Sequence, residues 1–382
     1  MPTDNGALHG ISVVDLSRVL AGPFCTQILG DHGADVVKIE SPAGDDTRAW
    51  GPPFDGETAS YFLGLNRNKR SVVLDLSTHE GRQVLEELLA KADVLIDNFK
   101  PGTLVRWGLG SETIRSRYPR LVHCCVSGFG ETGPLGRLPG YDAVLQAMVG
   151  IMSVNGETGG GPLRVGIPVV DLVTGLNAAI GILLALQERS RSGQGQFVDV
   201  SLYDCGISVL HPQLANYFLS GRNPARFGNT HPNIVPYDLF QASDGLIFIG
   251  AGNEPQFRKL CSYLELDDIV EDPRFRNNAA RSVNREVLRA ILEERLASRG
   301  TQQLARELGD LGVPCGPLQT LDAVVAHPHT QHREMVVDID GVRTVGTPIK
   351  LSRTPATYRY APPALGEHTA QVLETVKLAA KP

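Results

Sequence analysis

Up to about residue 130, the chain alternates short apolar runs with stretches of helical periodicity. The apolar runs predict strands at 11–16, 34–39, 71–76, 94–96 and 121–126. A helical stretch ending at Asp31 lies between the first two runs, and residues 77–92 predict a second helix. There, Ser77 and Glu80 have the spacing of a capping box. This βαβ rhythm predicts a parallel sheet covered by helices.

The second half of the chain has a different pattern. Residues 220–236 are polar and rich in Gly, Pro and Asn. Beyond them, the pattern predicts a strand at 246–250 and helices around 255–265 and 284–308. After a connector rich in Pro and His, Asp340 and Gly341 predict the turn of a hairpin within 335–345. We therefore predict a second, smaller α/β unit.

Charge and hydropathy limit the classes of partner. The 382 residues include 36 basic and 42 acidic side chains, which gives a net charge of −6. Because nucleic-acid binding needs a positive surface, we expect no nucleic-acid partner. The most apolar stretch, 169–186, is interrupted by polar residues, so it predicts a buried helix rather than a membrane span. We therefore expect no membrane partner.

The N-terminus and the cysteines indicate the compartment. The first ten residues show no basic segment followed by an apolar one, so we expect no signal peptide. The six cysteines have neither CxxC spacing nor the spacing of metal ligands. We therefore expect reduced thiols, a cytoplasmic protein and no metal site.

Two motifs resemble binding sites but lack the surrounding pattern. Residues 128–133 form a literal GxGxxG, yet Pro134 follows at once, so no helix begins there to bind a pyrophosphate. We expect a glycine-rich active-site loop instead of a dinucleotide site. His327, His329 and His332 have a spacing that fits no metal-ligand pattern, which predicts an exposed loop.

Asp171 is a lone carboxylate at the start of the long apolar helical pattern. One interpretation is structural, because a negative charge in the first turn interacts favourably with the helix dipole. The other is functional, because a partly desolvated carboxylate can attack a carbonyl carbon and form a covalent intermediate. The residues alone leave both interpretations open.

A series of motifs resembles one enzyme family. In chain order they are 15–23 (DLSRVLAGP), 33–40 (GADVVKIE), 44–48 (GDDTR), 66–76 (NRNKRSVVLDL), 97–102 (DNFKPG), 127–134 (SGFGETGP), 166–175 (GIPVVDLVTG), 191–202 (RSGQGQFVDVSL) and 312–317 (GVPCGP). The match covers residues 8–355, and on it the chain is identified as a member of the family III (CaiB/BaiF) CoA-transferases. This group includes formyl-CoA transferases and α-methylacyl-CoA racemases.

The resemblance implies an acyl-CoA transferase in which Asp171 is the catalytic aspartate. CoA is then a substrate and a product, and no tightly bound cofactor or metal is required. By position, the resemblance implies CoA contacts at Leu20, Ala21, Leu74, Asp75, Leu76, Ser77, Asn98, Phe99, Lys100, Arg106, Tyr141 and Asp142. CoA phosphates favour cationic partners, and Lys38, Arg67, Lys69 and Arg70 lie in the same motifs.

Tyr141 favours acyl transfer over racemisation. The racemases that the chain resembles place a His before an Asp at this point, and the pair moves an α-proton. Here the pair is Tyr141 and Asp142, and Tyr is a poor base near neutral pH. A racemase or epimerase on the same fold and a CoA-binding protein without activity are the two alternatives.

Other stretches look most similar to the succinyl-CoA:glutarate transferases, among them 215–221 (ANYFLSG) and 228–237 (GNTHPNIVPY). The chain lacks the tetraglycine loop of the oxalate-specific formyl-CoA transferases, which disfavours oxalate as the acceptor. The resemblance thus implies a dicarboxylate acceptor, for which Arg48, Arg226 and His231 are candidate ligands.

We therefore expect an α/β fold with a large Rossmann-like domain and a smaller α/β domain. The expected division is 1–205 for the first part of the large domain, 206–230 and 316–330 for linkers, 231–315 for the small domain, and 331–382 for a segment that completes the large domain. The resemblance further implies an interlaced homodimer in which the linkers cross.

Overall fold

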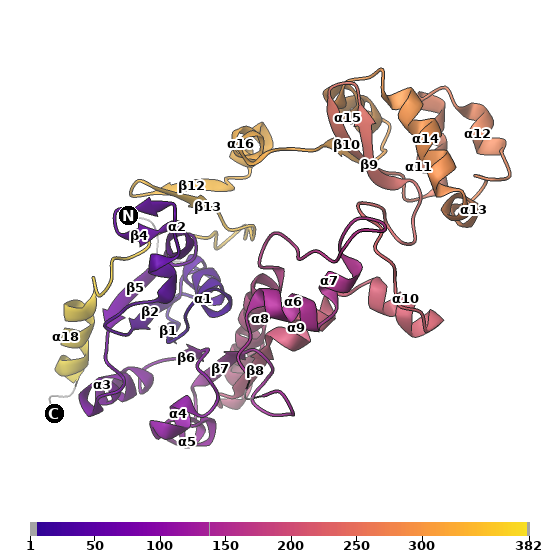
Figure 1. Ribbon diagram of the computed structural model, residues 1–382. Coiled ribbons are helices and arrows are strands. Elements are labelled where there is room, and N and C mark those ends of the chain that lie inside the picture. The colour runs from indigo at the N-terminus through magenta and orange to yellow at the C-terminus, as the bar shows by residue number, and fades with distance from the viewer. Residues whose placement is uncertain (1–5, 137, 380–382) are drawn as a thin grey trace. The chain divides into compact units, whose positions relative to one another are not determined.

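The computed structural model describes residues 6–136 and 138–379, which form two compact units (Figure 1). The larger unit contains the described residues up to Ile151, the segment Arg164–His211 and the described residues from Pro328 onward. The smaller unit contains Met152–Leu163 and Pro212–His327. The larger unit thus extends past the expected boundary at 205, and a short segment before Arg164 groups with the smaller unit.

The larger unit is built on six parallel strands in the order β5-β2-β1-β6-β7-β8. They are β1 (Ser12–Asp15), β2 (Asp35–Glu40), β5 (Lys69–Val73), β6 (Val94–Asp97), β7 (Val122–Ser127) and β8 (Phe197–Ser201). This confirms the predicted α/β class with a parallel sheet. The order reverses between β1 and β6, and such a reversal opens a crevice at the carboxyl ends of the strands.

The remaining elements of the larger unit are mostly helices. They are α1 (Ala21–Asp31), η1 (Asp46–Ala49), α2 (Ser60–Leu63), α3 (His79–Leu89), α4 (Thr103–Arg106), α5 (Ser111–Arg117), α6 (Asp142–Met148), α8 (Val169–Ser192), α9 (Leu202–Ser208), α17 (Pro328–His332) and α18 (Thr369–Ala379). Two hairpins accompany them, β3 (Phe54–Asp55) with β4 (Thr58–Ala59) and β12 (Val336–Ile339) with β13 (Val342–Val345). The hairpin predicted around Asp340 and Gly341 is confirmed.

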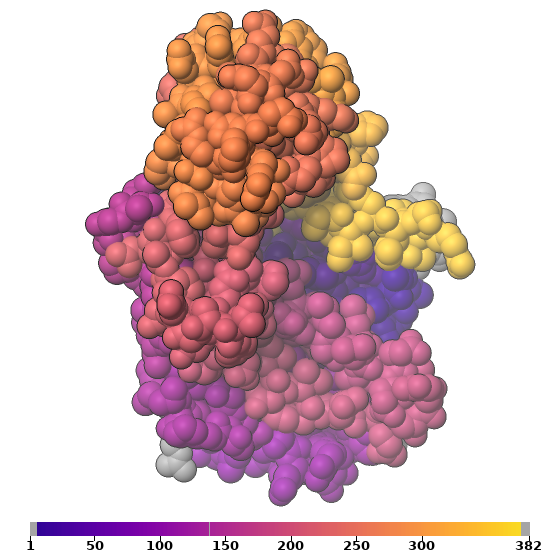
Figure 2. Space-filling model, turned by 90° about the vertical axis from the view of Figure 1, so that its right-hand side faces the viewer, coloured from indigo at the N-terminus to yellow at the C-terminus, as the bar shows by residue number. Residues whose placement is uncertain are grey.

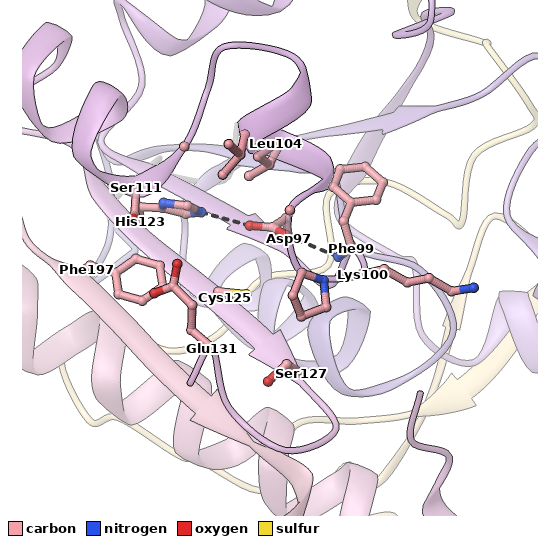
Figure 3. Close-up of a pocket in the computed structure, with 14 residues that line it drawn as sticks. Asp97, Phe99, Lys100, Leu104, Ser111, His123, Cys125, Ser127, Glu131 and Phe197 are labelled. Carbon is pink, nitrogen blue, oxygen red and sulfur yellow. Dashed lines mark hydrogen bonds and ion pairs between the residues drawn. The ribbon is translucent and has the colours of Figure 1, made fainter. Parts of the chain in front are cut away.

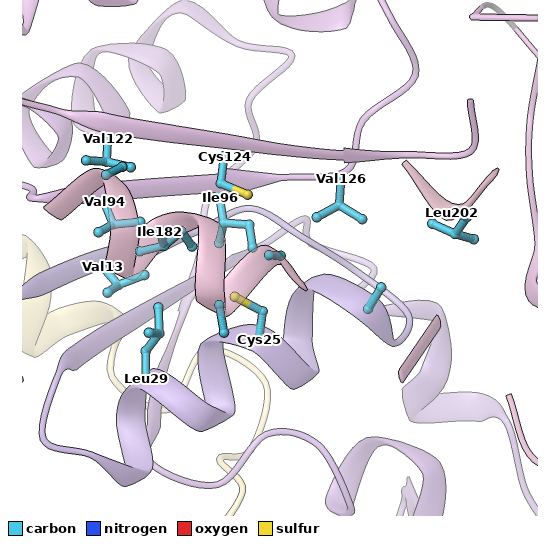
Figure 4. Packing of buried hydrophobic residues seen from close by; sticks show 14 of the residues in the cluster. Val13, Cys25, Leu29, Val94, Ile96, Val122, Cys124, Val126, Ile182 and Leu202 are labelled. Carbon is cyan, nitrogen blue, oxygen red and sulfur yellow. The ribbon is translucent and has the colours of Figure 1, made fainter. Parts of the chain in front are cut away.

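Helices cover both faces of the sheet, and the alternation of side chains along the strands separates two cores. Val13 and Ile96 point to the face covered by α1 and α8, where Cys25 and Ile182 pack against them (Figure 4). Val14 and Leu95 point to the opposite face, which α3, α5 and α18 cover.

Helix α3 begins at His79, two residues after the predicted start at Ser77. The Thr78 side chain, rather than Ser77, accepts the hydrogen bond from the backbone N–H of Gly81 (3.1 Å). Ser77 instead donates its hydroxyl to the Asp75 carboxylate (2.6 Å). The capping residue is therefore Thr78.

Helix α8 is long and apolar enough to cross a membrane by length and composition alone, but one of its faces lies in the core of the larger unit. It crosses α1 so closely that a Cβ on Gly175 would lie 2.6 Å from the carbonyl oxygen of Ala21. The opposite face exposes Leu176, Ile180 and Leu184. The prediction of a buried helix therefore holds for one face only.

The smaller unit has an antiparallel sheet in the order β11-β10-β9 with its own apolar core. Its strands are β9 (Tyr237–Ala242), β10 (Gly245–Gly250) and β11 (Cys315–Pro317). Its helices are α10 (Gln213–Ser220), α11 (Glu254–Tyr263), α12 (Asp267–Glu271), α13 (Asn278–Val283), α14 (Arg285–Leu296), α15 (Thr301–Asp310) and α16 (Leu321–Ala326), while α7 (Ile151–Val154) begins at the boundary. The single helix predicted over 284–308 is thus two helices.

The C-terminal segment completes the larger unit. Figures 1 and 2 show this yellow segment against the indigo N-terminal part of the chain. The backbone N–H of Thr357 donates to the Asp31 carbonyl (2.9 Å), and the N–H of His368 donates to the Ser71 carbonyl (2.9 Å). The first and last parts of the chain therefore share one core.

Four charged side chains are fully buried beneath the loop that follows β1. Lys38 pairs with Asp45 (3.0 Å) and Lys69 pairs with Asp15 (3.3 Å), and all four side chains are 0% exposed. The Lys38 ammonium also donates to the carbonyl of Ser17 in that loop (2.8 Å). The network therefore balances two cations with two anions and fixes the chain at the end of β1.

We expect Lys69→Met to destabilise the protein by about 3–5 kcal/mol, because it leaves Asp15 buried without its cation. Arg70→Met is the matched control, since Arg70 pairs with the half-exposed Asp35 and its loss costs about 1 kcal/mol or less. Chemical denaturation measures both free energies of unfolding, and equal losses would contradict a structural role for the buried pair.

Candidate active site

A pocket of about 180 Å³ lies at the carboxyl ends of β1, β6 and β7 in the larger unit. This is the place where the strand order reverses, the usual ligand site of an open parallel sheet. It brings together seven of the predicted site residues, namely Leu20, Ala21, Asn98, Phe99, Lys100, Tyr141 and Asp171.

The Asn98 side chain connects the loops that follow β6 and β1, the two strands between which the strand order reverses. Its side-chain oxygen accepts from the backbone N–H of Arg18 (2.9 Å), and its amide group donates to the Arg18 carbonyl (2.7 Å). The loop after β6 thereby holds the loop after β1. Arg18 also lines the pocket, although the sequence did not single it out.

Two glycines form another wall of the pocket. A Cβ on Gly128 would lie 3.0 Å from the Cα and the N of Gly140, so this close approach of two backbones requires glycine. In the described part of the chain, the next helix after the loop at 128–133 is α6, which begins at Asp142. Gly128 of the glycine motif therefore lines this pocket, and the motif leads into a close backbone contact rather than directly into a helix.

Asp171 lies in the first turn of α8, but Asp142 caps that helix. One Asp142 oxygen accepts from the backbone N–H groups of Val170 (2.8 Å) and Asp171 (3.3 Å). The N–H groups of Val169 and Leu172 bond to the carbonyls of Ile167 and Pro168. These partners satisfy the helix N-terminus without the Asp171 side chain, and Asp171 lines the pocket.

Burial, followed by repulsion from the Asp142 carboxylate, raises the pKa of Asp171 to about 7. The folded protein therefore binds a proton that the unfolded chain, with a pKa of 3.8, releases. Between these two pH values the contribution of Asp171 to stability decreases as the pH rises. A strongly raised pKa of a carboxylate that lies in a cleft is typical of functional sites.

Tyr61 is a second group near Asp171 that the sequence analysis missed. Burial, and then the Asp171 carboxylate, raise the pKa of its phenol to about 12. The phenol is therefore protonated at neutral pH and can donate a hydrogen bond. No motif spacing in the sequence points to this residue.

Lys38 and Arg48 do not have the predicted roles. The Lys38 ammonium is fully buried and paired with Asp45, so its assignment as a contact of CoA is wrong. Arg67 and Lys69, of the same basic run, are also buried in ion pairs. The Arg48 guanidinium holds both oxygens of Glu40 (2.7 and 2.8 Å) and the carbonyl of Pro363, which gives it a structural role.

The other predicted residues lie outside this pocket. The Asp142 carboxylate is 8% exposed and engaged in capping α8, so it is available neither to CoA nor to a racemase-type proton transfer. Leu74 and Leu76 are buried, whereas Asp75 and Ser77 are exposed after β5. Arg106 is exposed at the end of α4.

Arg226 and His231 belong to the smaller unit, whereas Asp171 belongs to the larger one. The Arg226 guanidinium donates to the carbonyl of Gly160. The His231 ring lies edge-on to Tyr237, and its Nδ1 accepts from the N–H of Asn233 (3.0 Å).

Figure 3 shows a second, smaller pocket of about 50 Å³ in the larger unit. His123 on β7 pairs there with Asp97 on β6 (2.8 Å), and Lys100 extends away from this pair. Phe99, Lys100, Pro101 and Ser127 line both pockets. The loop after β6 therefore borders two adjoining spaces.

The described residues hold no group of three or more His, Cys, Asp or Glu side chains that could bind a metal ion. His329 and His332 lie in the short helix α17, where an exposed loop was expected, and both are exposed.

Residues 8–369 match the model of CoA-transferase family III, and the chain belongs to this family. It is 42% identical to a succinate–glutarate CoA-transferase of Agrobacterium fabrum, with 100% of this chain and 99% of that protein covered. It is 41% identical to an acetyl-CoA:oxalate CoA-transferase of Acetobacter aceti, with 91% and 90% covered. A CaiB/BaiF family protein from Brucella suis has the same fold, with a TM-score of 0.87, 44% identity and 97% and 100% covered. The protein is a CoA-transferase.

If Asp171 is the nucleophile, it must be ionised to attack, and kcat/KM for an acyl-CoA donor should then rise about tenfold per pH unit below pH 7 and level off above it. Asp142→Asn removes the neighbouring charge and keeps an oxygen that can cap α8. It should therefore lower the pKa of Asp171 and move the rise to lower pH. A pH profile with the same inflection in both proteins would contradict this coupling.

Proposed function

We propose that the protein transfers CoA from a succinyl-CoA-like donor to a dicarboxylate acceptor, with Asp171 as the nucleophile. The observation that carries the proposal is that Asp171 lines the pocket, while Asp142 rather than Asp171 caps α8. The named relatives act on succinate and glutarate, or on oxalate, and all three acids are dicarboxylates. Because one similar protein is named for oxalate, the panel of acceptors to test includes oxalate.

The first half of the reaction moves CoA onto the enzyme. The Asp171 carboxylate attacks the donor thioester, which forms a mixed anhydride and releases the CoA thiolate. The thiolate then attacks the aspartyl carbonyl of the anhydride. This step yields an aspartyl-CoA thioester and frees the donor as its carboxylate.

The second half reverses these steps with the acceptor. The acceptor carboxylate attacks the aspartyl-CoA thioester, which forms a new anhydride and again releases the thiolate. The thiolate attacks the acceptor carbonyl of that anhydride, giving acceptor-CoA and restoring the Asp171 carboxylate. No proton or electron is gained or lost over the cycle.

Each attack creates an oxyanion that needs hydrogen-bond donors. The first-turn N–H groups of α8 already have hydrogen-bond acceptors, so the helix N-terminus is a poor source of donors for the oxyanion. We infer that the backbone at Gly128 and Gly140, which lines the pocket beside Asp171, supplies the donors. One such donor stabilises the transition state by about 3–4 kcal/mol.

We propose that CoA lies along the loop after β6. Lys100 and Arg106 are exposed cations on or near this loop and suit the phosphates of CoA. Coenzyme A is then substrate and product, and the cycle needs no tightly bound cofactor. All six cysteines are free, in keeping with the reducing cytoplasm that we propose as its location.

We expect Asp171→Ala to lower transfer on the order of 10³-fold or more, because the covalent route loses its nucleophile. The assay supplies succinyl-CoA with a panel of carboxylic acids and detects new acyl-CoA species by mass spectrometry. Calorimetry should show that the variant still binds CoA. An Asp171→Ala enzyme with wild-type rates would overturn the proposal, and solvent deuterium at the α-carbon of a branched acyl-CoA would indicate a racemase.

We also propose that the protein is a homodimer, interlaced as the family resemblance implies. The outer face of α8 carries an apolar stripe at helical spacing, in which Leu176, Ile180, Leu183 and Leu184 are 43%, 54%, 41% and 65% exposed. Val144 and Met148 of α6 are also exposed. Contiguous exposed apolar residues are typical of a protein–protein interface.

Light scattering should therefore give a mass of two 41.2 kDa chains. The double substitution Ile180→Glu and Leu184→Glu places charges on the stripe and should shift the mass toward one chain. A wild-type mass of one chain at micromolar concentration would contradict the homodimer.

A further inference from the structure

Among the residues that the structure describes, two cations line the pocket that holds Asp171, namely Arg18 and Lys100. Lys100 has a proposed role with CoA, and Arg18 has none. A dicarboxylate reacts through one carboxylate only, and its second charge must enter the pocket unreacted. Burying that charge is unfavourable unless a cation pairs with it.

The backbone beside Arg18 is held in a strained conformation. Val19 has φ of 72°, a left-handed conformation that is unfavourable for a β-branched residue. Its N–H donates to Asp45 (3.3 Å), and Asp45 is itself held by the buried Lys38 (3.0 Å). Asn98 bonds both the N–H and the carbonyl of Arg18 from the other side. Strain that is maintained in this way is typical of functional positions.

The Arg18 side chain itself is only loosely engaged. Its guanidinium lies 3.6 Å from the Asp46 carboxylate, and the two side chains are 49% and 59% exposed. An exposed pair at this distance contributes little stability, so another carboxylate can replace Asp46 at small cost. Asp46 also lines the pocket. A rigid backbone thus carries a cation whose present partner is exchangeable.

We propose that Arg18 determines specificity by binding the far carboxylate of the dicarboxylate, which takes the place of Asp46. The planar guanidinium suits a bidentate contact with a carboxylate. This inference rests on the proposed function, because it assumes that a dicarboxylate reacts at Asp171. Arg18 acts on the substrate group that does not react.

The test compares glutarate with its monoamide, which replaces the far carboxylate by a neutral group of the same shape. At saturating succinyl-CoA, kcat/KM for each acceptor is measured in wild type, Arg18→Gln, Arg18→Lys and Asp46→Asn. Arg117→Gln is the matched control, since Arg117 pairs with Glu86 on the surface. Thermal unfolding and CoA affinity are measured for every variant.

We expect wild type and Arg117→Gln to favour glutarate on the order of 10- to 100-fold, and Arg18→Gln to remove this preference mainly by loss of glutarate. Arg18→Lys should keep part of the preference, and Asp46→Asn should lower KM for glutarate by freeing Arg18.

Three results would overturn the assignment of Arg18. The first is an Arg18→Gln variant that loses kcat/KM equally for glutarate and its monoamide. The second is an Arg18→Gln variant that binds CoA more weakly but still prefers glutarate. The third is a wild type that does not prefer glutarate. A wild type that transfers CoA only to monocarboxylates would instead overturn the proposed dicarboxylate class, and Arg18 with it. If Arg18→Gln does not fold, the other two variants decide the question. The preference for glutarate should fall in Arg18→Lys, and KM for glutarate should fall in Asp46→Asn.

Discussion

The hydrogen bonds from the N–H groups of Val170 and Asp171 to the Asp142 carboxylate are the interaction on which the active site depends. They cap α8 without the side chain of Asp171, which lines the pocket. The same Asp142 charge adds to the effect of burial on the pKa of Asp171. One buried side chain therefore caps the helix and helps to raise the pKa of Asp171, the proposed nucleophile.

The sequence was sufficient for most of the parallel sheet, because strands covered on both faces are continuous apolar runs. β1, β2, β5, β6 and β7 lie on such runs, displaced by one to three residues at some ends. β8 was missed because Phe197–Ser201 mixes polar with apolar residues and is only partly buried. Helices α14 and α15 were predicted as one, since the residues at 297–300 do not interrupt the helical pattern strongly.

The site was harder to predict, because charge in a sequence does not reveal burial. Lys38 was expected to contact the phosphates of CoA, yet it pairs with Asp45 in the core, where neither side chain is exposed. Arg18 was missed because its position depends on Asn98, which is distant in sequence and meets it only where the strand order reverses. Asp142 was assigned to CoA, since no spacing links it to the helix that it caps.

The contact of the C-terminal segment with Asp31 and Ser71 gives the chain an order of assembly during synthesis. The ribosome makes the six strands of the larger unit first, but the residues that bond to the region of the edge strand β5 emerge last. The smaller unit, which ends at His327, is complete before then. The larger unit is thus the first to begin folding and the last to be completed. Until the C-terminal segment binds, the edge strand β5 is uncovered and prone to aggregation.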